Sequence, residues 1–154
     1  MVLFKSVLHN IGVLLVGLAL AWLCTFADSH LGISSFASSF WLGLGSLFSM
    51  LGFLLRVWAT VPFYSHKMRV ISLEPQGALI TSGPYRFSRN PLYLGGNVLV
   101  FFGAALFVGS PTALVATVLH LPLMDRFIRR EEAQLERRFG EEWQNYKSRV
   151  RRWL

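Results

Sequence analysis

Two polar stretches stand out in a mostly apolar chain because they carry residue types that bind ligands. The first is SGPYRFSRNPLYLGG at 82–96, which places arginines, an asparagine and tyrosines in a backbone rich in Gly and Pro. Proline stiffens such a loop, and glycine lets a ligand approach the backbone closely. The second is RREE at 129–132, which follows an apolar segment. A helix lying on a membrane surface gains nothing from paired carboxylates there, although the two preceding arginines could simply neutralise them.

The composition indicates a membrane protein. Of 154 residues, 53% are hydrophobic and 15% are charged, whereas soluble domains carry about 25% charged residues. Mean hydropathy is +0.47. The formal charge of +7 would suit nucleic acid, but the basic residues follow the edges of apolar segments, which favours lipid head groups instead. The single Cys24 excludes a disulfide framework, and the four histidines lack metal-ligand spacing, so we expect no metal site.

Four apolar segments predict an all-α membrane protein with a single domain, residues 1–154. The expected membrane spans cover about 11–27, 36–63, 93–108 and 112–128. Between the second and third spans we expect a loop over 64–92, and after the fourth an amphipathic helix over 129–150. GSP at 109–111 predicts a tight hairpin, because Gly and Pro end one helix and open the next.

The basic residues predict the orientation of these spans. Lys5 precedes the first span, the loop over 64–92 carries four Lys or Arg residues, and the tail from Asp125 onward carries nine. The connections at 29–35 and 109–111 carry none. Both termini and the central loop are therefore predicted to be cytoplasmic, in the inner membrane if the source is bacterial. The alternative for the first segment is a cleavable signal peptide.

Small and charged residues inside the spans make further predictions. Glycines recur along them, and we expect most of these to allow close helix packing: Gly12, Gly17, Gly43, Gly45, Gly52, Gly95, Gly96 and Gly103. Arg56, in LLRVWA, must reach the head groups, pair with another group or face a polar cavity. His120 lies in the fourth segment, where a packed, hydrogen-bonded histidine is expected rather than one that faces a substrate.

The chain resembles the isoprenylcysteine carboxyl methyltransferase-like family, which also takes in phospholipid methyltransferases. Three features taken together carry the resemblance: LITSGPYRFSRNPLYLGG, the helical hairpin and RREEAQLERRFGEEWQNYKSRV. That family shows SGPY, then an RHPxYxG box, then EE followed by FGEEYxxY. The resemblance covers about residues 43–150 and includes LLRVWA at 54–59. Asn90 stands where the family has the histidine of RHP, and Phe127 stands where some relatives have arginine, which leaves the acceptor open.

The resemblance implies an integral membrane enzyme that transfers a methyl group from S-adenosylmethionine to a lipophilic acceptor. The cofactor would lie on the cytosolic side, beneath the loop and the C-terminal helix. The implied cofactor-binding residues are Gly77, Ala78, Leu79, Ile80, Tyr85, Arg89, Asn90, Pro91, Leu92, Tyr93, Glu131 and Glu132. Glu131 would receive the cofactor's ammonium group, and Arg89 or a backbone amide its carboxylate. Arg126 and Arg130 are candidates for the acceptor side.

Several alternatives stay open from sequence alone. The acceptor can be a prenylated cysteine carboxylate, a phospholipid amine, or a hydrophobic thiol or acid; the lack of an obvious base slightly favours an anionic one. A sterol-reductase-like enzyme that uses a nicotinamide cofactor shares a similar box and tail, although RREE argues against it. A non-catalytic scaffold is the third reading. In it, Tyr85 and Tyr93 are interfacial aromatics, and Arg86 and Arg89 only set topology.

Overall fold

The computed structural model describes residues 1–70 and 77–154, and every regular element in this part of the chain is helical. The elements, in order, are α1 (Val2–His30), α2 (Ser39–Ser65), a short 3₁₀ turn (Gly83–Arg86), α3 (Pro91–Tyr93), a π-helix (Leu94–Val100), α4 (Phe101–Val108), α5 (Pro111–Phe139) and α6 (Glu141–Arg149). The predicted all-α class is confirmed. Part of the expected loop over 64–92, residues 71–76, lies outside the described residues.

Three helical segments are long and apolar enough to cross a membrane: α1, α2 and the continuous run Pro91–Val108. Their outer faces carry large apolar side chains that a soluble protein would bury, including Leu15, Leu23, Leu51 and Leu54. The chain is therefore an integral membrane protein. The fourth predicted span is not among the three, because the apolar stretch of α5 is interrupted by His120 and closed by Asp125.

The end of α5 differs from the predicted boundary between a span and a separate tail helix. The helix runs without a break from Pro111 to Phe139 and ends at Gly140, where φ is 48°. The sequence after residue 128 consists of good helix formers such as Arg, Glu, Ala, Gln and Leu, so nothing stops the helix earlier. Glycine adopts the positive φ without strain, and α6 then starts in a new direction.

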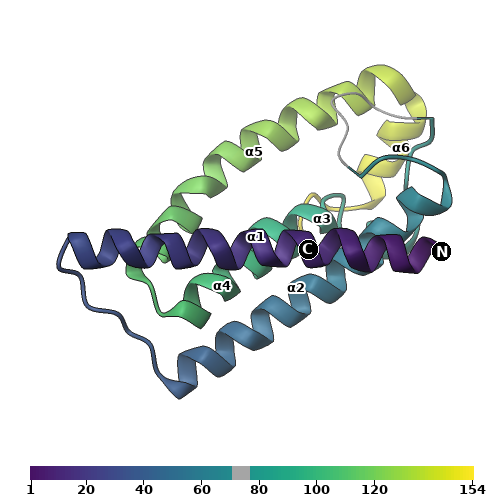
Figure 1. Cartoon of the computed structure of the whole chain (residues 1–154). Helices are drawn as coiled ribbons and strands as arrows, with labels where there is room; N and C mark the ends of the chain where they lie inside the picture. Colours follow the sequence, from purple (N-terminus) through teal and green to yellow (C-terminus); the bar gives the residue numbers. More distant parts are fainter. Residues whose placement is uncertain (71–76) are drawn as a thin grey trace.

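The two ends of the helices differ in charge, and Figure 1 shows which helix ends lie together. The start of α1, the end of α2, the end of α5 and α6 lie at one end, which carries most of the Lys and Arg residues. At the other end, Phe36 donates its backbone N–H to Gly109 O at 3.0 Å, which joins the α1–α2 connection to the α4–α5 turn. Residues 31–38 and 109–111 contain no Lys or Arg.

The predicted tight turn at 109–111 is confirmed. Helix α4 ends at Val108 and α5 begins at Pro111. Ser110 caps α5 by accepting a hydrogen bond from the backbone N–H of Ala113 at 3.1 Å. Asp28 from α1 accepts hydrogen bonds from the Ser110 hydroxyl and from the Thr112 backbone N–H. A carboxylate here is favourable because it faces the positive end of the helix dipole.

Glycines bring α2 against the segment formed by the π-helix and α4. A Cβ atom built on Gly45 would lie 2.6 Å from Gly103 O, and one built on Gly52 would lie 2.5 Å from Gly95 O. These contacts are with backbone atoms, which cannot move aside. The expected packing role is confirmed at these positions, whereas Gly12 and Gly43 have no such neighbour within 4 Å.

Candidate functional site

A cavity of about 200 Å³ lies at the basic end of the helices, between the end of α2, the segment before α3, α5 and α6. Of the twelve cofactor-binding residues expected from sequence, ten line it: Ala78, Leu79, Ile80, Tyr85, Arg89, Asn90, Leu92, Tyr93, Glu131 and Glu132. Gly77 and Pro91 do not line it. Arg126 and Arg130, expected on the acceptor side, are exposed on α5 and do not line it either.

The apolar part of the cavity wall comes from a cluster at the end of α2. Ala59, Ile80 and Tyr85 are buried together, and Phe63 and Leu92 pack against them. The rings of Phe63 and Tyr85 are 5.9 Å apart between centroids. This wall is apolar and includes two aromatic rings, which suits the ring system of a nucleoside.

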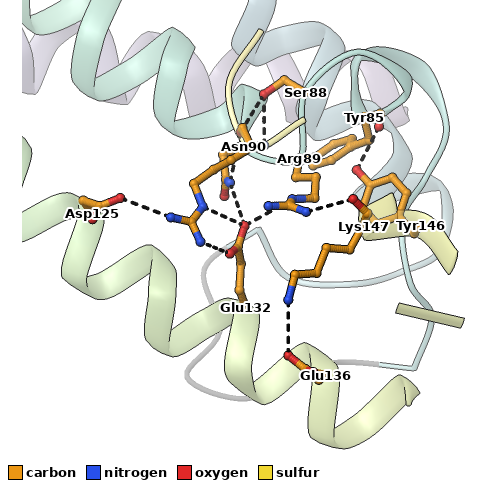
Figure 2. A network of polar contacts seen from close by, with 10 residues as sticks. Tyr85, Ser88, Arg89, Asn90, Asp125, Glu132, Glu136, Tyr146 and Lys147 are labelled. Carbon is orange, nitrogen blue, oxygen red and sulfur yellow. Dashed lines mark hydrogen bonds and ion pairs between the residues drawn. The ribbon is translucent and has the colours of Figure 1, made fainter. Parts of the chain in front are cut away.

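The two adjacent carboxylates have very different surroundings. Glu132 is buried and lies between cations: its Oε2 is 2.5 Å from Arg152 Nη2, and its Oε1 is 3.3 Å from Arg89 Nε. Asn90 Nδ2 also approaches Oε1 at 3.4 Å. Figure 2 shows Arg89, Asn90 and Glu132 converging at the centre of this network. The charge of Glu132 is therefore already compensated within the protein.

Glu131 instead forms no ion pair with any residue in the described parts of the chain. Its Oε2 accepts a hydrogen bond from the hydroxyl of Tyr93 at 2.9 Å. Burial raises the pKa of the Glu131 carboxyl above its usual range, and the nearby Glu132 charge adds to this, while the Tyr93 hydrogen bond acts in the opposite direction. A half-buried carboxylate on a cavity wall, without a cation, is suited to receive one from a ligand.

Among the residues that line the cavity, two buried donor atoms have neither a hydrogen bond nor an ion pair in the part of the chain that the structure describes: the Tyr85 hydroxyl and Trp143 Nε1. Both side chains are almost fully buried, at 6% and 2% exposure. Burial raises the pKa of the Tyr85 hydroxyl well above its ordinary value, so it stays protonated and able to donate. Unpaired buried donors are costly, and a bound ligand with acceptor atoms would satisfy them.

The C-terminal segment after α6 packs against residues 88–90, which lead into α3. The backbone N–H of Arg89 donates to Arg151 O at 2.9 Å. Ser88 Oγ and Asn90 Nδ2 each donate to Arg152 O at 3.2 Å. Asn90, which replaces the family's histidine, thus links Glu132 to the tail by hydrogen bonds that need no titratable group.

Replacing Arg152 with Gln is expected to destabilise the protein by about 1.5–3 kcal/mol, because a buried carboxylate loses a charged hydrogen-bond partner. The pKa of Arg152 is raised mainly by its hydrogen bond to Glu132, in agreement with a strong pair. Thermal unfolding of the purified protein in detergent measures the effect. The matched control is Arg151→Gln, since the Arg151 side chain is exposed and the substitution keeps its backbone carbonyl. Equal stability of the two variants would contradict this account of Glu132.

Arg89 lines the cavity, but its contacts are largely within the protein. Besides its ion pair with Glu132, Nη1 donates to Lys147 O at 3.2 Å, and the guanidinium lies 5.7 Å from the centre of the Trp143 ring. These contacts join the segment RNPLYLG at 89–95 to α6. A topology-only role for Arg89, one of the sequence-based alternatives, does not account for them.

Arg56 is the main cavity residue for which the sequence left the role open. It is 8% exposed, so it does not reach out to the head groups. Its Nε donates to Asn10 Oδ1 at 2.8 Å and its Nη1 to Leu92 O at 2.9 Å. The side chain crosses over Gly96, where a Cβ would lie 2.5 Å from Nη1. Arg56 is thus held by α1 and α3 and lines the cavity.

Sequence reasoning missed several other cavity residues: Phe63, Met68, Asn97, Leu135, Trp143 and Tyr146. Tyr146 donates its hydroxyl to Tyr85 O at 2.8 Å, which holds α6 over the cavity. The apolar spacing along the tail, which includes Trp143 and Tyr146, was a signal for a buried helix face. It does not tell a face buried in a membrane surface from one buried against the protein.

Fold and cavity together define an integral membrane protein with a partly polar cavity at the basic end of its helices. The chain belongs to the phospholipid methyltransferase family, which its residues 28–142 match. This membership indicates a membrane methyltransferase. Part of the chain is also 36% identical over 58 residues to an uncharacterised protein of Haemophilus influenzae, an alignment that covers 37% of this chain and 92% of the other. Four residues that line the cavity or contact its lining residues lie outside the matched range: Asn10, Trp143, Tyr146 and Arg152.

Proposed function

We propose that the protein transfers a methyl group from S-adenosylmethionine to a lipophilic acceptor. The observation that carries this proposal is Glu131, a half-buried carboxylate on the cavity wall that has no cation of its own among the described residues. The methionine end of the cofactor carries an ammonium group that such a carboxylate would bind. The unpartnered donors of Tyr85 and Trp143 support a ligand with several acceptor atoms.

When bound, the cofactor would supply an activated methyl group, because its sulfonium is already electrophilic. The protein's own task is then mainly to bind and orient the two reactants. Glu131, oriented by Tyr93, would bind the ammonium group. The wall formed by Ile80, Tyr85 and Leu92 would pack against the adenine, and Tyr85 and Trp143 would donate hydrogen bonds.

The acceptor and the cofactor would reach the site from different phases. The cavity adjoins the end of α2 and the segment that begins at Pro91, both apolar enough to span a membrane. A lipophilic acceptor can therefore approach from the bilayer, while the cofactor comes from water. We further propose that the basic end of the helices, with both termini, is cytoplasmic, and that α5 supplies a fourth span.

The test is calorimetric titration of S-adenosylhomocysteine into the purified protein in nanodiscs. We expect a Kd of roughly micromolar order. Labelling of a lipid extract with tritiated methyl groups from S-adenosylmethionine follows as the test of transfer. Folded protein that binds neither S-adenosylhomocysteine nor S-adenosylmethionine would refute the proposal. Titration with a nicotinamide dinucleotide in the same nanodiscs tests the reductase alternative.

The affinity for S-adenosylhomocysteine is expected to fall as the pH is lowered through the raised pKa of Glu131, because the protonated carboxyl cannot pair with the ammonium group. The unliganded protein should show the opposite trend. Between the ordinary pKa of Glu and the raised one, the folded state binds more protons than the unfolded state, so this residue's contribution to stability falls as pH rises. Titrations from acid to neutral pH measure the first effect. A Glu131→Gln variant with the same pH profile as the unmodified protein would contradict the assignment.

A further inference from the structure

Asn97 is a cavity residue in the middle of the π-helix, and its side chain has a partner on another helix. Its Nδ2 lies 2.7 Å from Nε2 of His120 on α5. The His120 ring also packs on Phe101, with 6.1 Å between the ring centroids. The expectation of a packed, hydrogen-bonded histidine is confirmed. The pair is nevertheless unusual, because two polar side chains meet inside segments that are otherwise apolar.

The position of Asn97 separates it from the proposed cofactor end of the cavity. It follows Tyr93, the partner of Glu131, by about one helical turn along the segment that runs into the membrane. His120 precedes Glu131 by 11 residues on α5, or about 16 Å of helix at 1.5 Å per residue. Asn97 therefore lines the end of the cavity that faces the membrane interior, which a lipophilic acceptor would reach first.

The π-helix explains how an amide comes to line the cavity here. A π-helix widens the turn and occurs frequently at functional sites. Gly95 and Gly96 precede Asn97, and the Arg56 side chain fills the space beside both of them. The wider turn then places Asn97 next along the same wall, with α5 close enough for His120 to hold its amide.

The hydrogen bond to His120 leaves the amide oxygen available. Asn97 Nδ2 can only donate, so Nε2 of His120 is the acceptor in this hydrogen bond. No other hydrogen bond of Asn97 occurs within the described ranges, 1–70 and 77–154, so its Oδ1 accepts none from the protein there. A carbonyl oxygen at membrane depth without a donor is unfavourable until a ligand supplies one.

We propose that Asn97 determines acceptor specificity, and that His120 is a positioning residue that holds its amide. This inference rests on the proposed methyl transfer. With Nδ2 fixed by His120, Oδ1 would accept a hydrogen bond from the acceptor's head group. The acceptor's nitrogen or oxygen would bond to the methyl carbon as the S–CH₃ bond breaks, and the proton displaced from the acceptor would pass to water. The acceptor is then a lipophilic molecule with a neutral N–H or O–H donor, such as an uncharged amine or a phenol. An ionised carboxylate has only acceptor oxygens and would meet the lone pairs of Oδ1, so the anionic acceptor slightly favoured by sequence is disfavoured.

The experiment uses the full chain in phosphatidylcholine nanodiscs at neutral pH with tritiated S-adenosylmethionine and three added probes: 4-dodecylphenol, 4-dodecylaniline, which is an uncharged amine at this pH, and palmitic acid. We expect label in the phenol or the amine and little in the acid. Asn97→Leu should lower the labelling by at least about tenfold, because a site built to bond a donor loses that bond, while affinity for S-adenosylhomocysteine changes by less than about twofold. Unchanged cofactor affinity shows that the variant is folded.

His120 provides the second pair of variants. His120→Leu should act in the same direction as Asn97→Leu, raising KM for the probe more than it lowers kcat. His120→Gln should restore most of the activity, because its carbonyl oxygen can accept the same hydrogen bond. Preferential labelling of palmitic acid, no labelling of either donor probe by protein that binds S-adenosylhomocysteine, or full activity of Asn97→Leu would each overturn the inference. If the unmodified protein did not bind S-adenosylhomocysteine at all, the proposed function itself would be refuted instead.

Discussion

Replacing Glu131 with Gln is expected to weaken the binding of S-adenosylhomocysteine by at least about tenfold, or about 1.4 kcal/mol. Glutamine keeps the size of the side chain and an oxygen for the Tyr93 hydroxyl to donate to, but it removes the charge that would pair with the ligand's ammonium group. Because that charge forms no ion pair among the described residues, removing it should change the free energy of unfolding little. Calorimetry in nanodiscs measures the affinity.

Two controls distinguish this role from a general effect of removing a carboxylate. Glu142→Gln changes an exposed residue of α6 and should leave both affinity and stability unchanged. Glu132→Gln should instead lower stability, because Arg89 and Arg152 lose their common partner in the interior. If Glu131→Gln bound the ligand as tightly as the unmodified protein, the ammonium site would have to lie elsewhere in the cavity.

Replacing Gly45 with Ala is expected to destabilise the fold by about 3 kcal/mol, the upper part of the range for overpacking. The new Cβ would lie 2.6 Å from Gly103 O and still closer to the backbone nitrogen of Phe107. Backbone atoms of α4 cannot rotate away, so α2 and α4 would have to move apart. The π-helix that continues into α4 packs on α2 through Gly52 and Gly95, beside the cavity residue Arg56, so binding of S-adenosylhomocysteine should weaken as well.

The control for this prediction lies two residues away. A methyl group added at Gly43 would meet no atom within 4 Å, so Gly43→Ala should be neutral or stabilising by up to about 1 kcal/mol through helix propensity. Denaturant unfolding in detergent compares the two variants. A loss of stability in Gly43→Ala as large as that in Gly45→Ala would show that close packing of α2 against α4 is not what makes Gly45 necessary.

Several features of the fold and of the cavity could be predicted from local sequence alone. Membrane helices reveal themselves by length and apolar composition, which is why the segments of α1, α2 and Pro91–Val108 were predicted close to their observed positions. The turn at 109–111 was predictable because Gly and Pro act locally. The family motifs indicated ten residues that do line one cavity, because binding residues in such motifs keep their spacing along the chain.

Other features depend on contacts between distant parts of the chain. The sequence places Glu131 and Glu132 side by side, yet one is bonded to Tyr93 and the other to Arg89 and Arg152. Adjacent residues on a helix point about 100° apart, so each meets different neighbours. Which neighbours they meet depends on where α3 and the C-terminal segment pack, and no local pattern specifies that.

The sequence by itself determined that this protein is helical, lies in a membrane and belongs with methyltransferases, because composition, periodicity and motif spacing are properties of the chain. Only the tertiary structure decided which carboxylate lacks a cation, that Arg56 is held by Asn10 within the protein, and that Asn97, which lines the cavity, meets His120 on α5. Burial and pairing are set by side chains brought together from separate helices. Those contacts, rather than residue types, distinguish a binding group from a structural one.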